Sequence, residues 1–107
     1  MDAVLQRRLL GLAGLGIRGR NAVVGVDKVR AAALAGKLRL AMVAGDASHH
    51  SRDKVVPLLA AKGITLVDGF AAADLGAVCG REATAVIGIV DVQLAKGIRG
   101  ALGSAGE

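Results

Sequence analysis

The hydrophobic positions of the chain follow helical spacing in some segments and form short continuous runs in others. Near the N-terminus, Leu5, Leu9 and Leu12 recur at helical spacing behind Asp2, a good N-cap residue, and this pattern predicts a first helix. The segment 14–21 that follows contains three glycines and two arginines. Because glycine disfavours the interior of a helix or strand, we expect a flexible, cationic loop there.

Four apolar runs have the length and composition of buried strands. They cover residues 22–24, 38–44, 64–67 and 84–90. The first run ends at Gly25, the second at the Gly-Asp pair 45–46 and the third at the Asp-Gly pair 68–69. Glycine and aspartate favour turns, so we predict that each of these three strands ends in a turn.

Helical spacing between these runs and after the last one predicts four further helices. Their approximate bounds are residues 26–36, 49–62, 71–79 and 91–102. Ser48 and Asp91 are the expected N-caps of the second and the fourth of these helices, and Asp46 is expected to cap the helix that follows it. Pro57 removes one backbone hydrogen bond within residues 49–62, so that helix either bends or begins later.

The predicted elements alternate strictly, from a helix at one end of the chain to a helix at the other. Apolar strands that alternate with helices form the middle layer of a sandwich. We therefore expect an α/β fold, a three-layer α/β/α sandwich with a central four-stranded mixed sheet. A length of 107 residues suits one domain, residues 1–107, and is too short for two. Residues 103–107 are expected to form a frayed tail.

The composition excludes one common kind of RNA recognition. Hydrophobic residues make up 53% of the chain, but Phe70 is its one aromatic residue. Proteins that bind single-stranded RNA on a sheet or barrel stack bases on aromatic side chains, at about 1–3 kcal/mol per base. One aromatic residue cannot provide such a platform.

Positive charge is concentrated in the first part of the chain. The whole chain has a net charge of +5, and residues 18–39 contain six Lys or Arg residues and one acid. If the loop 14–21, the start of the second helix and the turn at Gly36 lie at one end of the sheet, they form a positive surface that includes a helix N-terminus. Such a surface suits the phosphates of a nucleic acid, and a solvated charged face is the alternative.

Other chemistry finds no support in the sequence. Cys79 is the one cysteine, which excludes an internal disulfide and a multi-cysteine zinc site, and a structural role suits it best. His49 and His50 are adjacent, so on a helix they point about 100° apart and cannot chelate one metal ion. We expect no catalytic residue, no metal and no cofactor, and we do not expect an enzyme. With one cysteine and no N-terminal basic-then-apolar segment that ends in a cleavage site, we expect a cytoplasmic protein. No apolar run approaches the roughly 20 residues that span a bilayer, so we expect no membrane partner.

The segment from Gly25 to Ser48, followed by residues 74–80 (DLGAVCG) and 84–91 (TAVIGIVD), resembles the kink-turn-binding ribosomal protein superfamily. That superfamily includes the archaeal large-subunit protein seven-Ae, the thirty-e protein and small bacterial homologues, of which the bacterial branch is the most similar. The resemblance covers about residues 9–102. It implies an α/β/α sandwich, in agreement with the order of elements above, and a ribosome- or translation-associated protein that binds structured RNA.

In this superfamily a glycine at a strand-to-helix turn, a polar pair and a basic residue on the first helical turn bind RNA at tandem sheared G·A pairs. The glycine corresponds here to Gly25, and the polar pair corresponds to Asp27 and Lys28. Asp27 can accept hydrogen bonds from base amino groups, and Lys28 can reach guanine or a phosphate. The basic position corresponds to Ala31, which can make neither contact, and Arg30 is the residue that would substitute for it.

A second contact in the superfamily is the loop before the last strand, which corresponds here to residues 80–84. The complete set of expected RNA contacts is Arg18, Arg20, Gly25, Asp27, Lys28, Arg30, Arg81 and Ala83. The expected partner is a structured RNA, either ribosomal RNA or another kink-turn-like RNA, with ribosomal proteins as further partners and no DNA.

Two other classes of function stay open. The same fold could serve as a protein-interaction module whose RNA recognition is weakened by Ala31. RNA affinity regained in the variant Ala31→Lys would support that interpretation. A small-ligand-binding or enzymatic α/β protein would instead need a concave pocket with convergent polar groups at the strand ends.

Overall fold

The computed structural model describes residues 1–105 and confirms the predicted order of helices and strands. The elements are α1 (Ala3–Arg18), β1 (Ala22–Val24), α2 (Val26–Leu34), β2 (Leu40–Ala44), α3 (His49–Ala61), β3 (Thr65–Phe70), α4 (Ala72–Val78), β4 (Val86–Ile89) and α5 (Val92–Ala105). Residues 103–105 of the expected tail are therefore helical, because α5 continues through them. The rest of that tail, residues 106–107, lies outside the described residues.

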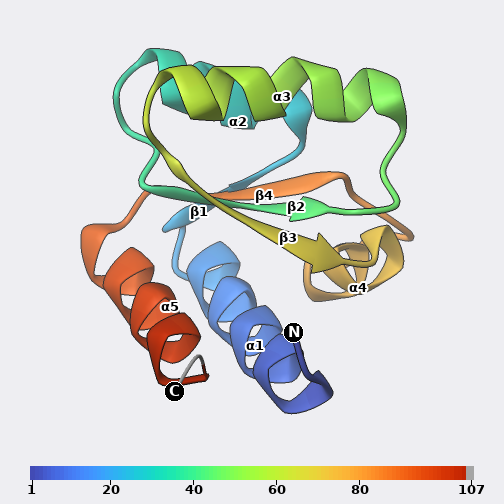
Figure 1. Ribbon diagram of the computed structural model, residues 1–107, viewed down its shortest axis with the longest axis vertical. Helices are drawn as coiled ribbons and strands as arrows, with labels where there is room; N and C mark the ends of the chain where they lie inside the picture. The colour runs from blue at the N-terminus through green and yellow to red at the C-terminus, as the bar shows by residue number, and fades with distance from the viewer. Residues whose placement is uncertain (106–107) are drawn as a thin grey trace.

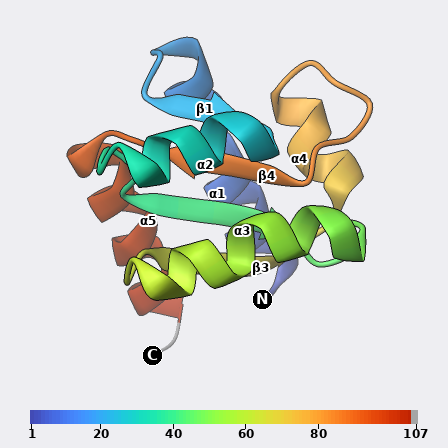
Figure 2. The same cartoon turned by 90° about the horizontal axis from the view of Figure 1, so that it is seen from above.

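The four strands form one mixed sheet in the order β1-β4-β2-β3. Strand β4 runs antiparallel to both β1 and β2, whereas β2 and β3 are parallel. Helices α2 and α3 cover one face of the sheet, and α1, α4 and α5 cover the other (Figure 1). Viewed from the α2 and α3 side, these two helices lie side by side across the sheet (Figure 2). The predicted three-layer sandwich with a mixed sheet is confirmed.

Strand β2 lies at the centre of the core because both of its faces are buried. Leu40 and Met42 pack into a cluster with α1, α4 and α5, whereas Ala41 and Val43 pack into a cluster with α2 and α3. Successive side chains of a strand point to opposite faces, so one strand contributes to both clusters. This position explains why the run is apolar throughout instead of alternating.

The prediction of a flexible loop over residues 14–21 is wrong for most of that segment, which belongs to α1. Gly14 and Gly16 are buried in the helix, and a β-carbon on Gly16 would lie 2.5 Å from Cδ2 of Leu94 in α5. Glycine at this position lets α1 approach α5 closely. This packing outweighs the helix penalty of glycine, about 1 kcal/mol. Only residues 19–21 connect α1 to β1.

The Asp-Gly pair 68–69 does not end β3, as predicted, but forms a bulge within it. Strand β3 advances from Val67 to Phe70 while β2 advances by one residue fewer, from 42 to 44. Gly69 adopts a φ of +95°, a conformation that side chains with a β-carbon rarely adopt. The turn signal was correct for the backbone geometry and wrong for the end of the strand.

Helix α3 begins where its predicted N-cap stands. The backbone N–H of Ser51 donates to Oγ of Ser48 at 3.1 Å, and the helix runs from His49 with Pro57 inside it. The alternative prediction, that this helix begins later because of Pro57, is therefore wrong. Asp91 caps α5 as predicted, since its Oδ2 accepts a backbone hydrogen bond at 2.8 Å.

Asp46 does not cap α3, the helix that follows it, which was the prediction. Its Oδ1 accepts a hydrogen bond from the backbone N–H of Ala72 at 2.8 Å and so caps α4. The parallel pairing of β2 and β3 is the reason, because it brings the ends of both strands together. The N–H of Gly45 donates to the carbonyl of Phe70 at 2.9 Å at the same place.

Candidate nucleic-acid interface

The turn from β1 into α2 is built on Gly25. Its φ of +97° and ψ of 160° lie in a region that glycine alone occupies without strain. Its N–H donates to the carbonyl of Val86 in β4 at 3.0 Å. Since Gly25 has no side chain to cap α2, the first backbone N–H groups of the helix lack intrahelical partners and can bind an anion or a base oxygen.

The first turn of α2 presents the expected polar pair to solvent. Asp27 and Lys28 are exposed, and Ala31 is exposed one turn further along the same face. Val29 and Ala33 are buried against the sheet. The hydrophobic spacing of α2 therefore orients its polar pair away from the core.

The loop between α4 and β4 packs beside this turn. The N–H of Arg81 donates to the carbonyl of Gly76 at 2.9 Å, and the N–H of Thr84 donates to the carbonyl of Ala72 at 3.0 Å. Nη1 of Arg81 lies 3.9 Å from the place that a β-carbon on Gly25 would occupy. Two segments far apart in sequence thus meet at one end of the sheet.

Gly76 of α4 allows this loop to lie directly on the helix. A β-carbon on Gly76 would lie 2.6 Å from Cα of Ala83 and 2.9 Å from the carbonyl oxygen of Arg81. Both loop residues are exposed, so the close packing presents them to solvent beside Gly25. We call this group of residues the α2-turn surface: Gly25, Asp27, Lys28, Arg81 and Ala83.

Arg30 does not lie on the α2-turn surface. Its guanidinium donates a hydrogen bond to the backbone carbonyl of Lys54 in α3. This hydrogen bond ties α2 to α3 and directs the side chain away from the face that carries Ala31. The structure therefore does not bring Arg30 together with the other expected contacts on α2.

The loop 14–21, the start of α2 and the turn at Gly36 do not share one end of the sheet, contrary to expectation. Helix α2 separates Gly25, which precedes it, from Gly36, which follows it. A row of paired residues marks the end of the sheet opposite Gly25: Ala22, Ile89, Leu40 and Thr65. Arg20 and the turn at Gly36 lie just beyond this row, so the cationic segment 18–39 is divided between two ends of the molecule.

Arg18 ends α1, on the face of the sheet opposite α2. Its Nη1 lies 3.5 Å from the place of a β-carbon on Gly14, so the side chain folds back along its own helix. Among residues 1–105, no side-chain hydrogen bond joins Arg18 to the α2-turn surface. The expected contacts Arg18, Arg20 and Arg30 thus lie apart from the five that the structure brings together.

An ion pair that the sequence analysis missed ties α3 to the bulge of β3. Nη2 of Arg52 lies 2.7 Å from Oδ2 of Asp68, and Nη1 of Arg52 donates to the carbonyl of Ala44 at 2.7 Å. The hydrogen bond from Arg52 lowers the pKa of the Asp68 carboxyl. No sequence spacing indicates this pair, because the bulge decides where Asp68 points.

Cys79 has the environment of a structural cysteine. Its Sγ donates to the carbonyl of Leu75 at 3.1 Å, and burial raises the pKa of its thiol, which disfavours the reactive thiolate. In the part of the chain that the structure describes, no three His, Cys, Asp or Glu side chains are placed to hold a metal ion. Over the same residues, no helix combines the length and the apolarity needed to cross a membrane.

The fold and the α2-turn surface define a class, the small α/β/α sandwich proteins with an uncapped helix N-terminus beside the loop that carries Arg81. The sequence matches the ribosomal protein L7Ae/L30e/S12e/Gadd45 family over residues 16–98, and the chain belongs to this family. The matched region includes all four strands and the whole α2-turn surface.

Two solved structures are similar to this chain. A protein with unknown function from Bacillus halodurans C has a TM-score of 0.80 at 24% sequence identity, over 89% of this chain and 96% of that chain. The 15.5kD RNA binding protein of Giardia lamblia has a TM-score of 0.83 at 21% identity, over 97% of this chain and 89% of that chain. These similarities show a shared fold. No curated protein matches the sequence significantly.

Proposed function

We propose that residues 1–107 form one RNA-binding domain that binds structured, kink-turn-like RNA through the α2-turn surface and acts with the ribosome or in translation. The observation that carries this proposal is the position of the Arg81 guanidinium, 3.9 Å from the β-carbon place of Gly25. This position joins the N-terminus of α2 and the loop of Arg81 into one exposed surface. The family contains ribosomal proteins, and a protein of the same fold from Giardia lamblia is an RNA binding protein, which supports the proposal.

Each group of the α2-turn surface has a role in this proposal. The free N–H groups after Gly25 and the Lys28 ammonium bind phosphate or the acceptor edge of guanine. Asp27 accepts hydrogen bonds from base amino groups that sheared G·A pairs expose. Arg81 binds the backbone, and Ala83 covers an apolar base surface. With two cations on the surface, binding loses affinity with a salt slope of about −2, at about −0.9 per phosphate neutralised.

Titration of two RNAs tests the proposal. One RNA contains a kink turn, and in the other Watson–Crick pairs replace its tandem G·A pairs. Fluorescence anisotropy at two salt concentrations is expected to give tighter binding of the kink-turn RNA. The variants Lys28→Ala and Arg81→Ala are expected to weaken that binding by about tenfold each, as a lost charge-assisted contact of about 1.5 kcal/mol implies. Lys54→Ala, at an exposed lysine of α3, is the matched control and is expected to bind as the unchanged protein does.

The two RNAs and the control variant separate the parts of the proposal. Equal affinity for both RNAs would refute recognition of the kink turn. Equal losses in Lys28→Ala, Arg81→Ala and Lys54→Ala would refute the α2-turn surface as the site.

A second candidate function is a protein-interaction module, and the outer face of α2 favours it. Ala31 is exposed on this face, and Leu34, one turn later, is 60% exposed. A face that ends in two apolar residues suits contact with another protein. In that case neither RNA binds the unchanged protein, whereas Ala31→Lys gains affinity for the kink-turn RNA.

A further inference from the structure

Four connections meet at the end of the sheet opposite the α2-turn surface. This end of the sheet is marked by a row of paired residues, Ala22, Ile89, Leu40 and Thr65. The links from α1 to β1, from α2 to β2, from α3 to β3 and from β4 to α5 all lie beyond it, on the left in Figure 1. Sheet topology therefore gathers segments from the whole length of the chain.

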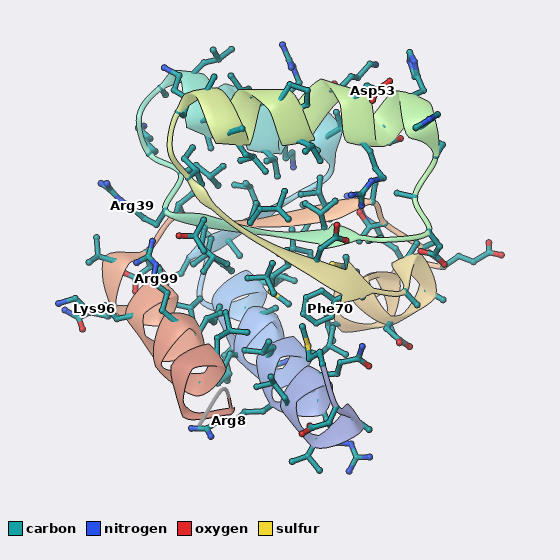
Figure 3. The ribbon with its side chains drawn as sticks, viewed as in Figure 1. Arg8, Arg39, Asp53, Phe70, Lys96 and Arg99 are labelled. Carbon is teal, nitrogen blue, oxygen red and sulfur yellow. The ribbon has the colours of Figure 1, made fainter. Side chains whose placement is uncertain are left out.

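These connections and the start of α5 carry six exposed cations. They are Arg20, Lys37, Arg39, Lys62, Lys96 and Arg99, called the second basic surface below. Figure 3 shows Arg39, Lys96 and Arg99 on the same side of the molecule. The guanidinium of Arg99 donates to the backbone carbonyl of Arg39 at 2.8 Å, which holds α5 against the start of β2. At least part of this surface is therefore fixed in place by the fold.

Acidic groups do not balance these cations. Asp91 is the one acid in the four connections, and its carboxylate is occupied as the N-cap of α5. Among residues 1–105 the one ion pair joins Arg52 and Asp68, at the other end of the sheet. The α2-turn end, in contrast, combines its two cations with the neighbouring acids Asp27 and Glu82.

Stabilisation of helix ends explains only part of this charge. Lys37 and Lys62 follow the C-terminal ends of α2 and α3, where the helix dipole favours a cation by about 0.3–1 kcal/mol. Arg39, Lys96 and Arg99 gain nothing from that effect, because none of them stands in the last turn of a helix in this cluster. Their mutual repulsion is relieved by a polyanion.

We propose that the second basic surface binds the phosphate backbone of an RNA helix, in addition to the RNA at the α2-turn surface. The outer strands of the sheet are three strand spacings apart, about 14 Å, so the cations extend over that width. A helical backbone offers closely spaced negative charge along such a length, whereas a small anion would occupy one point. The protein then bridges two RNA segments from opposite ends of one rigid sheet. This proposal does not depend on kink-turn recognition.

Two charge-matched triple variants test it. The first, Lys37→Gln with Lys62→Gln and Lys96→Gln, removes three cations from the second basic surface. The control, Arg7→Gln with Arg8→Gln and Lys54→Gln, removes three exposed cations from α1 and α3. The probe is a 16-base-pair RNA duplex without a kink turn, measured by fluorescence anisotropy from 50 to 200 mM salt. Unfolding in urea checks that both variants fold.

The first variant is expected to bind the duplex at least tenfold more weakly. Each neutralised phosphate contributes about −0.9 to the salt slope, so the loss of three cations is expected to make the slope shallower by about 2–3. The control is expected to retain the affinity and the slope. The duplex probe has no kink turn, so a failure of kink-turn recognition leaves this result intact. Equal losses of duplex affinity in both triple variants would mean that net charge alone determines binding, which would overturn the proposal. Binding of poly-glutamate without binding of the duplex would assign the surface to an acidic protein and would also overturn it.

Discussion

The substitution Gly76→Ala tests how the fold positions the loop between α4 and β4, which we propose binds RNA. Its added methyl group would lie 2.6 Å from Cα and 2.7 Å from N of Ala83, and 2.9 Å from the carbonyl oxygen of Arg81. All three atoms belong to the backbone, so rotation of a side chain cannot relieve the contact. Ordinary carbon contacts lie at about 3.5–4.0 Å, so the loop must move away from α4 by about 1 Å.

Two opposing effects set the expected change in stability. Overpacking of a well-packed site costs about 1–3 kcal/mol, whereas alanine favours a helix over glycine by about 1 kcal/mol. Gly76→Ala is therefore expected to lower the free energy of unfolding by about 1 kcal/mol. RNA affinity changes more, because Arg81 and Ala83 move relative to Gly25. Loss of one charge-assisted contact, about 1.5–3 kcal/mol, corresponds to about a 10- to 100-fold weaker complex.

Urea unfolding and anisotropy titration with the kink-turn RNA measure these two quantities. Gly97→Ala is the matched control, since Gly97 lies in α5 and a β-carbon there meets nothing within 4 Å. The control is expected to be slightly more stable and to bind RNA unchanged. A Gly76→Ala protein that matched the control in both stability and affinity would refute the reasoning, because the loop would then not depend on its contact with α4.

Three further predictions concern single positions. Ala31→Lys places a cation on the exposed face of α2. It is expected to raise affinity for the kink-turn RNA by about 1–3 kcal/mol, without a gain on the RNA that lacks G·A pairs. An equal gain on both RNAs would contradict base recognition. Gly25→Ala places a side chain on a backbone with φ of +97°, which strains it. This substitution is expected to lower the free energy of unfolding in urea by about 1–3 kcal/mol. Unchanged stability would contradict the geometry of the turn from β1 into α2. Because Arg52 lowers the folded-state pKa of Asp68, their ion pair stabilises the protein above the ordinary carboxyl pKa of about 4, and this contribution is lost as pH falls through the folded-state value. With the two side chains 25% and 41% exposed, Asp68→Asn is expected to cost less than about 1 kcal/mol at pH 7 and less still at pH 2, and an equal cost at both pH values would contradict the assignment.

Local sequence patterns were sufficient for the order of the elements and for the layers. The run from Leu40 to Ala44 is apolar at every position, which indicates a strand covered on both faces, and β2 is buried on both faces. Helical spacing over residues 26–36 was sufficient to predict α2, whose Val29 and Ala33 are buried. Such signals are readable because burial selects side chains at intervals set by the local backbone.

The glycines could not be interpreted in this way, because their roles depend on what lies next to them in space. Gly16 lies in α1, where Leu94 of α5 leaves no room for a β-carbon. Gly76 lies in α4, where the backbone of Ala83 leaves no room for one. Gly69 allows a bulge because β3 has one residue more than its partner strand. A sequence pattern shows that such a position is unusual, but not which neighbour requires it.

The charges show the same division between local and long-range information. The sequence correctly located the cations between residues 18 and 39 but predicted a single surface for them. Helix α2 places Lys28 at one end of the sheet and Lys37 at the other, and the strand order brings Arg81 to the first and Arg99 to the second. Charge along a chain is a local property. The grouping of charges into surfaces follows from the connections of the sheet, which pair residues far apart in sequence.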